Sequence, residues 1–333
     1  MIRILTYAPI PEDGTSFYRL SGAVNYLSKE YNDIYLHDIS GRTDLNWHNF
    51  TSYDMVIFQR PFIGEHLKLI NMMRLVGLKV IIDYDDDILN LPMHNPHYLS
   101  YSSNKENIEK IISVADEVWV STPQLKETAL KHNKNVVVIP NAHNDYMLDV
   151  KKKRDFDESN KKVAYRGGTT HEMDVYSRID EWTSIVNGNE DKNFFFIGAR
   201  FPYLESKCGE NYIIAPGSHI VDYFRNMHNL NPSIFIYTLE DTIFNRAKSN
   251  ISWIEATYVG AAVIAPEYLT EFIRPGIINF NESMDTVFEA VKDNTKKLKE
   301  MNEESWNYIR EKLLLSEVNK LRYQSILDVQ NRK

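Results

Sequence analysis

The sequence is almost without cysteine, since Cys208 is the only one among 333 residues. A single thiol excludes an intrachain disulfide framework and fits a reducing compartment. No apolar run approaches the roughly 18 residues that span a bilayer. The first residues also lack the apolar core and cleavage site of a signal peptide. These absences predict a cytoplasmic protein with no transmembrane segment.

The sequence also has no excess of basic residues. Lys and Arg number 38 against 46 Asp and Glu, which gives a net charge of −8 at pH 7. This balance gives no general attraction to nucleic acid or anionic lipid, although a local basic patch stays compatible with it. The basic run Lys151–Arg154 lies in a polar stretch and is interpreted as a solvated linker, with contact to a DNA backbone as the alternative.

What the chain does have is a regular alternation of short apolar runs and amphipathic segments. Short apolar runs bounded by polar residues are typical of strands covered on both faces, and strands that alternate with helices favour parallel sheets. The expected strands are Arg3–Ala8, Asp33–His37, Asp54–Gln59, Lys79–Asp83, Glu117–Ser121 and Asn135–Pro140, then Lys162–Arg166, Asn193–Ile197, Tyr212–Ala215, Ser233–Tyr237 and Ala261–Ala265. The expected helices between the first of them are Phe17–Glu30, Glu65–Val76, Lys105–Ala115 and Gln124–His132, the last with Thr122 as cap and Pro123 at its first position.

We therefore predict an α/β fold of two doubly wound, Rossmann-like domains in series, facing a cleft and followed by C-terminal helices. An N-terminal domain is expected at 1–145, a linker at 146–161 and a C-terminal domain at 162–333. The tail Ser283–Gln330 is interpreted as two helices, of which the last could pack back on the N-terminal domain. Ligands of such folds bind at the carboxyl ends of the strands.

Polar residues gather after the strand that ends near Tyr237. Asn245, Lys248, Ser249 and Glu255 lie where a loop is expected to become a helix. Free N–H groups at a helix start suit phosphate, and Lys248 adds a cation. Glu255 offers two oxygens to a ribose diol. Lys248 and Glu255 are expected on one face of the same helix, two turns apart. The pattern predicts a nucleotide-diphosphate site, with a surface ion pair of these two residues as the alternative.

In each half of the chain, a glycine-containing turn follows the first expected strand. In Arg166–His171, Gly167 and Gly168 can turn backbone N–H groups toward a diphosphate and Thr169 can cap the next helix. Asp174 is expected to hold His171 by a hydrogen bond. In Gly14–Arg19, Gly14 permits close approach of a ligand and Arg19 could bind a phosphate or an acidic acceptor; an ordinary loop capped by Thr15 or Ser16 is the alternative.

Four carboxylates, Asp83, Asp85, Asp86 and Asp87, cluster at the end of a strand, where they repel one another unless they have partners. They could orient sugar or acceptor hydroxyls, pair with Arg60, or bind a divalent metal.

In this order, the motifs resemble those of the GT-B glycosyltransferases, specifically the large retaining family four. The resemblance covers nearly the whole chain and rests on Gly14–Arg19, Phe58–Pro61, Asp83–Asp87, Ala115–Val118 with Ser121–Pro123, Pro140-Asn141, Tyr165–His171, and Phe244–Ser249 with Glu255. It implies transfer of a sugar, with retention, from a nucleotide-sugar on the C-terminal domain, with UDP favoured, to an acceptor on the N-terminal domain. No cofactor or metal is obligatory in that family. Asp85, Asp86 and Arg19 are then the candidate catalytic residues.

The donor residues that the resemblance implies are Gly14, Arg166, Gly167, Gly168, Thr169, His171, Asn245, Lys248, Ser249 and Glu255. Two departures stand out. Ala247 replaces the Glu that relatives carry eight positions before Glu255, and Asn245 with Lys248 resembles the substitute of a subgroup. The usual His at the end of the fourth strand is replaced by Asp83–Asp87.

The acceptor stays open at this point. A carbohydrate or surface glycan is the first expectation. A hydroxylated DNA base, as in bacteriophage enzymes, is the alternative; usage rich in Asn, Ile and Lys suits a phage or an AT-rich bacterium. A non-catalytic module that binds sugar nucleotides is the third possibility.

Overall fold

The computed structural model of the chain describes residues 1–333 except 12, 43, 44, 47, 49, 282 and 333. The described chain divides into two compact units, each built around one sheet. The first unit comprises Met1–Met147, Ala247–Ser249 and Leu313–Lys333, and the second comprises Leu148–Arg246 and Asn250–Lys312. Residues 148–161 thus cluster with the second unit, and the last helix with the first.

The sheet of the first unit has six parallel strands in the order β2-β1-β3-β4-β5-β6. Its strands are β1 (Ile2–Tyr7), β2 (Ile34–Asp38), β3 (Met55–Gln59), β4 (Lys79–Tyr84), β5 (Glu117–Val120) and β6 (Val136–Val138). Its helices are α1 (Gly14–Arg19), η1 (Val24–Tyr26), α2 (Leu27–Glu30), α3 (Gly64–Leu75), α4 (Tyr98–Ser102), α5 (Lys105–Val114), α6 (Pro123–Leu130) and α15 (Leu315–Asn331). Both faces of the sheet are covered, as continuous apolar strands require.

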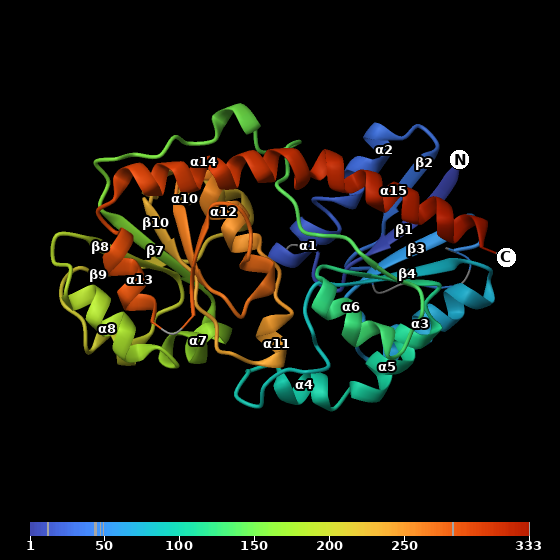
Figure 1. Cartoon of the computed structure of the whole chain (residues 1–333). Helices are drawn as coiled ribbons and strands as arrows, with labels where there is room; N and C mark the ends of the chain where they lie inside the picture. The colour runs from blue at the N-terminus through green and yellow to red at the C-terminus, as the bar shows by residue number, and fades with distance from the viewer. Residues whose placement is uncertain (12, 43–44, 47, 49, 282, 333) are drawn as a thin grey trace. The chain divides into compact units, whose positions relative to one another are not determined.

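Helix α15 covers one face of this sheet (Figure 1). Its apolar side chains, such as Val318 and Ile326, pack with Ile4 of β1 and Ile57 of β3. The indole Nε1 of Trp119 donates to Ser325 Oγ of α15 at 2.7 Å. Burial of this apolar stripe, rather than helix propensity alone, stabilises the helix where it lies.

The sheet of the second unit has six parallel strands in the order β12-β11-β10-β7-β8-β9. They are β7 (Lys162–Gly167), β8 (Asn193–Gly198), β9 (Tyr212–Pro216), β10 (Ile234–Ile236), β11 (Ala262–Pro266) and β12 (Ile277–Phe280). The helices are η3 (Val150–Lys152), η4 (Thr169–His171), α7 (Glu172–Tyr176), α8 (Ile179–Asn187), α9 (Pro202–Glu205), α10 (Ile220–Leu230), α11 (Ile243–Arg246), α12 (Ile251–Tyr258), η5 (Thr270–Phe272), α13 (Met284–Val291) and α14 (Thr295–Lys312). The core includes a cluster of aromatic rings, among them Tyr165, Trp182 and Phe196.

The eleven expected strands are confirmed within two residues at either end, and β12 was not expected. The cap of α6 is also confirmed, because Thr122 Oγ1 accepts from Leu125 N at 3.2 Å and Pro123 follows it. The tail prediction is wrong in number, since α13, α14 and α15 are three helices.

The single helix expected at Phe17–Glu30 is wrong. The chain forms α1, then η1 and α2, and a tight turn separates the first two. At Gly22 a Cβ would lie 2.3 Å from the carbonyl oxygen of Phe17, so this turn needs glycine. The cap of α1 is Asp13, whose Oδ1 accepts from Ser16 N at 2.6 Å, rather than Thr15 or Ser16.

None of the described helices combines the length and apolar character that crossing a bilayer requires. The basic run Lys151–Arg154 is partly docked in the second unit. Lys153 Nζ donates to Asn302 Oδ1 at 2.5 Å, and Arg154 Nη1 donates to the His228 carbonyl at 2.6 Å. Half of the run therefore has a structural partner.

Candidate functional site

The carboxyl end of β7 is formed by closely packed glycines. Gly198 at the end of neighbouring β8 has φ of +103°, and a Cβ there would lie 2.7 Å from Gly167 O. At Gly167 a Cβ would lie 2.9 Å from Tyr165 Oη and 3.0 Å from His171 Cβ. A side chain at Gly198 would therefore collide with backbone, and one at Gly167 would displace Tyr165 or His171. Gly167 is buried, whereas Gly168 and Gly198 are exposed. Gly168 has no such neighbour.

Glu255, in the middle of α12, reaches this same end of the sheet with a buried carboxylate. Its side chain is 2% exposed, and Oε1 accepts from Arg166 Nη2 at 3.2 Å. Oε2 accepts from Tyr223 Oη of α10 at 2.9 Å, and the Arg166 guanidinium lies 5.2 Å from the centre of the Tyr223 ring. Burial, with the Glu255 charge second, raises the pKa of Tyr223, so its hydroxyl remains a donor.

Sequence reasoning assigned Arg166 and Glu255 to one site, and the structure brings them together. The sequence did not indicate Tyr223, which lies 32 residues before Glu255 on another helix. The only local signal is the aromatic pair Tyr223-Phe224, which also fits ordinary core packing.

The Asp174 carboxylate joins the loop after β7 to the loop after β10. Its Oδ2 lies 2.7 Å from His171 Nδ1, so the expected hydrogen bond is confirmed. Its Oδ1 accepts from Asn245 Nδ2 at 2.8 Å and from the Glu240 backbone N at 2.7 Å. Asn245, 4% exposed, also donates to the Glu240 carbonyl. In this structure Asn245 therefore stabilises the loop after β10 from the protein interior. The sequence had predicted that it contacts the nucleotide-sugar directly.

Thr169 does not cap a helix as expected. It lies within η4, whose N-cap is Gly168 and has no side-chain capping bond, and α7 begins only at Glu172. The 3₁₀ turn at Thr169–His171 uses the hydrogen bond from His171 N to Gly168 O at 3.0 Å instead.

In the first unit, Arg19 and Asp83 form a buried ion pair at the end of β4. Arg19 Nε and Nη2 donate to the two oxygens of Asp83 at 2.9 and 2.7 Å, and the side chains are 0% and 1% exposed. Arg19 Nη1 donates to the Ile139 carbonyl at 2.6 Å and to Asn141 Oδ1 at 3.1 Å. The guanidinium is fully engaged and away from solvent, so the expected catalytic or phosphate contact of Arg19 is not supported. At Gly14 a Cβ would meet no atom within 4 Å, so no close approach requires glycine there.

Arg60, directly after β3, pairs with two other members of the acidic cluster. Its Nη2 lies 2.5 Å from Asp85 Oδ1 and 3.2 Å from Asp86 Oδ2. Arg60 has φ of +46°, a left-handed backbone that non-glycine residues seldom adopt. Such strain concentrates at functional sites, where surrounding contacts hold it. Burial lowers the pKa of Arg60, but Asp85 and Asp86 outweigh this and raise it overall.

Lys248 and Ser249 belong to the first unit. Lys248 Nζ lies 2.7 Å from Asp86 Oδ1, and Ser249 Oγ accepts from Asn141 Nδ2 at 2.8 Å. The prediction that Lys248 and Glu255 share one helix is wrong, because α11 ends at Arg246 and α12 begins at Ile251. Of the four residues between them, Ala247–Ser249 are held by contacts within the first unit, including the bond from Thr122 Oγ1 to the Ala247 carbonyl.

The structure thus gives every member of the acidic cluster its own partner. Asp87 is 2% exposed and its Oδ2 accepts from Asn90 and Thr128 at 2.9 and 3.1 Å. Burial raises the pKa of Asp85 and of Asp87. Within the described part of the chain, no group of three or more His, Cys, Asp or Glu side chains is arranged to hold a metal ion.

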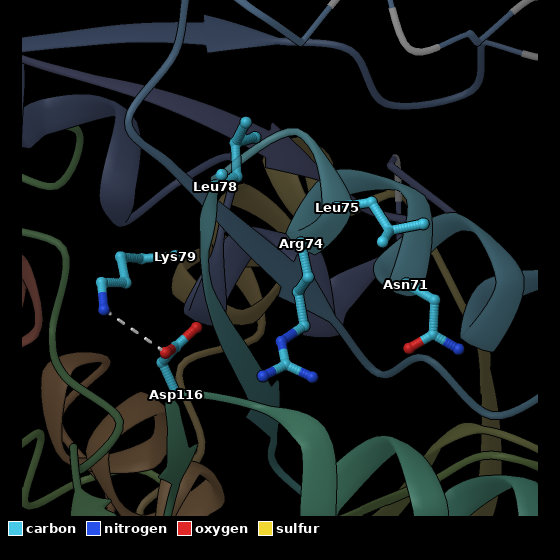
Figure 2. Close-up of a pocket in the computed structure, with 7 residues that line it drawn as sticks. Asn71, Arg74, Leu75, Leu78, Lys79 and Asp116 are labelled. Atoms are coloured by element: carbon cyan, nitrogen blue, oxygen red, sulfur yellow. Dashed lines mark ion pairs between the residues drawn. The ribbon is translucent and has the colours of Figure 1, made fainter.

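A pocket of about 520 Å³ lies at the opposite, amino-terminal edge of the first sheet (Figure 2). Lys79 begins β4 and lies 3.8 Å from Asp116, which precedes β5. Arg74 and Leu75 of α3 contribute the other wall. Ligands of parallel α/β sheets bind at the carboxyl edge, so this pocket is separate from the candidate site.

No protein-family model and no curated protein matches the sequence. Solved structures do match. The alpha-glucosyltransferase AGT in complex with UDP aligns over 100% of both chains, at 13% identity and a TM-score of 0.70. An alpha-glucosyltransferase in complex with UDP-glucose and DNA containing an abasic site aligns over 99% of both chains, at 14% identity and 0.68. TarM aligns over 84% of this chain and 55% of its own, at 13% identity and 0.62, so this chain spans about half of TarM.

The chain has the GT-B fold. Two Rossmann-like sheets of six parallel strands and the full-length match to the alpha-glucosyltransferases establish this. The fold prediction is confirmed, and the structural neighbours include GT-B glycosyltransferases.

Proposed function

We propose that the chain is a glycosyltransferase that moves a sugar from a nucleotide-sugar to an acceptor hydroxyl, with retention of configuration. The observation that carries the proposal is the Glu255 carboxylate. It is 2% exposed at the carboxyl end of the second sheet, and it is held by Tyr223 and by Arg166, which stays 30% exposed. A fixed carboxylate with two acceptor oxygens suits a ribose diol.

The neighbouring cation and backbone suit the rest of such a donor. Arg166 is the last residue but one of β7, and at the end of neighbouring β8 the exposed Gly198 lies so close to the Gly167 carbonyl that a side chain there is excluded. A guanidinium can neutralise charge that develops on a leaving diphosphate, which is the main electrostatic task in such a transfer. The neighbours solved with UDP or UDP-glucose support UDP as the nucleotide. Lys248 is kept as a second proposed phosphate cation, although it pairs with Asp86 here.

Two acceptor classes are proposed. A carbohydrate hydroxyl remains the first, with Arg60, Asp85 and Asp86 as the groups that would face it from the first unit. A hydroxylated base in duplex DNA is the second, because the neighbours solved with DNA align over the whole length of this chain. A module that binds the donor without transfer remains the non-enzymatic alternative.

Calorimetry with UDP, UDP-glucose, UDP-N-acetylglucosamine and GDP-glucose tests the donor half of the proposal. We expect one UDP-sugar to bind and Glu255→Ala to weaken it. Transfer from the bound donor is then assayed with oligosaccharides and with duplex DNA carrying a hydroxymethylated base. Binding with no transfer to either acceptor would favour the non-catalytic module, and failure of every nucleotide to bind would overturn the proposal.

Salt dependence separates the two acceptors. Contacts with duplex phosphates release counterions, so affinity for DNA must fall steeply between low and physiological salt. We expect no measurable duplex binding at physiological salt. A low-micromolar, salt-sensitive complex would promote the DNA acceptor. In that case, neutralising the exposed Lys151 and Lys152 would show whether the basic run contacts phosphate.

A further inference from the structure

The Asp174 side chain is an acceptor for three donors at once. The donors are His171 Nδ1 at 2.7 Å, Asn245 Nδ2 at 2.8 Å and Glu240 N at 2.7 Å. The Asp174 side chain is 7% exposed, and α7 and the loop after β10 meet at it. An ionised carboxylate has no proton to donate, so every contact that it makes must be supplied by a partner's hydrogen.

This arrangement determines the polarity of the His171 ring. Nδ1 must carry the hydrogen, because the carboxylate opposite can only accept. In the neutral ring the lone pair is then on Nε2. The His171 side chain is 21% exposed, and no hydrogen bond joins Nε2 to any residue that the structure describes. The ring therefore presents a fixed acceptor at the carboxyl end of β7.

The acceptor Nε2 of His171 can bind a ligand group only if that group donates a hydrogen. A phosphate oxygen can only accept, so the lone pair of a neutral Nε2 cannot hydrogen-bond it. A sugar hydroxyl can donate to that lone pair. Glu255 already supplies two acceptor oxygens for a ribose, and Arg166 supplies the donor for phosphate.

We infer that His171 recognises a hydroxyl group of the transferred sugar through Nε2, and that Asp174 is the positioning residue that fixes its ring tautomer. The inference rests on the proposed function and adds a specificity determinant to it. Sequence reasoning placed His171 among the donor contacts without distinguishing sugar from phosphate.

Asp174→Asn is the sharpest test because it preserves the shape of the cluster. Asparagine keeps one oxygen for Asn245 and Glu240 and presents an NH2 group to His171. Nδ1 must then accept, and the ring hydrogen moves to Nε2. We expect the affinity for the preferred UDP-sugar to fall by about tenfold or more, while the affinity for UDP changes by less than about twofold. His171→Ala should give the same selective loss.

Nitrogen-15 NMR of the imidazoles reads the tautomer directly and needs no ligand. We expect Nδ1–H in the wild type and Nε2–H in Asp174→Asn. His228→Ala, which removes another half-buried imidazole of the same unit, should leave both affinities unchanged. Thermal unfolding identifies variants that fail to fold, and if Asp174→Asn is among them, His171→Ala and the wild-type spectrum decide.

The outcomes separate this inference from the function on which it rests. If no nucleotide binds the wild type, the proposed function fails. If UDP and the UDP-sugar both bind, but His171→Ala weakens them by the same factor, the sugar contact is wrong. An Nε2–H tautomer in the free wild type, or an imidazolium in the UDP-sugar complex, would also overturn the inference and assign the ring to phosphate.

Discussion

Each unit holds an arginine and a carboxylate at the carboxyl end of its sheet, but the two pairs differ in their access to solvent. Arg19 and Asp83 in the first unit are 0% and 1% exposed and make two hydrogen bonds to each other. In the second unit Arg166 is 30% exposed and reaches the buried Glu255 with one nitrogen at 3.2 Å. The same two side-chain types therefore occur once as interior structure and once at a surface.

This difference explains which pair can serve a ligand. Removing two charges from water costs several kcal/mol, which only complete matching by partners offsets. The Arg19 guanidinium has such partners for all three nitrogens, because Nη1 donates to the Ile139 carbonyl and to the Asn141 amide oxygen. Arg166 keeps part of its hydration, so exchanging water for a phosphate costs little. A site residue is thus distinguished by incomplete burial rather than by residue type.

The largest expected effect is on stability, at the buried pair. Arg19→Met should lower the free energy of unfolding by about 3–5 kcal/mol, because Asp83 would stay buried without its partner. Urea unfolding measures this. The matched change in the second unit, Arg166→Met, should cost less, because Arg166 is 30% exposed and the buried Glu255 keeps its hydrogen bond from Tyr223.

Equal losses in the two variants would contradict the distinction between the pairs. If Arg19→Met does not fold at all, Asp83→Asn provides a milder version, since the amide keeps one oxygen for the guanidinium. Loss of donor binding in Arg166→Met with the fold intact would support its proposed place at the diphosphate.

Two histidines sharpen the comparison further. His66 of α3 is 8% exposed and its Nδ1 accepts from the Phe62 backbone N at 3.1 Å, whereas Nδ1 of His171 donates to Asp174. Burial lowers the pKa of His66 from 6.5 to about 4. The folded state thus binds this proton less readily than the unfolded state. The stability that His66 contributes is complete above pH 6.5 and is lost as the pH falls toward 4.

His66→Asn should remove this dependence, because its side-chain oxygen can accept from Phe62 but does not titrate. The wild type should lose about 3 kcal/mol more than the variant between pH 7 and pH 4. Unfolding free energies at several pH values measure the difference. Parallel curves for the two proteins would mean that the imidazole titrates normally in the folded state.

The fold was readable from the sequence because its signals are local. Apolar runs such as Lys79–Asp83, each bounded by polar residues, identify strands, and Thr122-Pro123 identifies a helix start. β12 was missed because Ile277–Phe280 is short and only the three-residue 3₁₀ helix η5 lies between it and β11, which gives no amphipathic pattern. The turn at Gly22 was missed because apolar spacing continues through it.

The site was readable only in part, since its contacts join distant residues. Arg166 and Glu255 could be placed together because Arg166 lies at the carboxyl end of β7 and Glu255 lies on a helix between β10 and β11 of the same sheet. The burial of Arg19 depends on Asp83, 64 residues away, and nothing near Arg19 in the sequence indicates it. Lys248 was misplaced because three residues, Ala247–Ser249, cluster with the first unit although both neighbouring helices belong to the second.

The next largest expected effect is on binding of the nucleotide-sugar at Arg166 and Glu255. Glu255→Ala should lose about 1.5–3 kcal/mol of affinity for the UDP-sugar, roughly ten- to a hundredfold, because charged hydrogen bonds to the ribose disappear. Calorimetry measures it. Tyr223→Phe, which removes only the bond to Glu255 Oε2, should cost less than Glu255→Ala. An unchanged affinity of Glu255→Ala for the UDP-sugar would contradict the proposed contact between Glu255 and the ribose.

The smallest expected effect separates a functional lysine from a structural one within the first unit. Lys248 and Lys79 are both partly exposed and each faces one aspartate, Asp86 at 2.7 Å and Asp116 at 3.8 Å, but at opposite edges of the sheet. Neither alanine variant should change the unfolding free energy by more than about 1 kcal/mol, because both pairs are solvated. Lys248→Ala should nevertheless lower kcat/KM by about tenfold, since a cation that stabilises the leaving phosphate acts most strongly in the transition state. Lys79→Ala should leave kcat/KM unchanged, because ligands bind at the carboxyl edge. Wild-type turnover in Lys248→Ala would contradict this role and leave the pair with Asp86 as the contribution of this lysine.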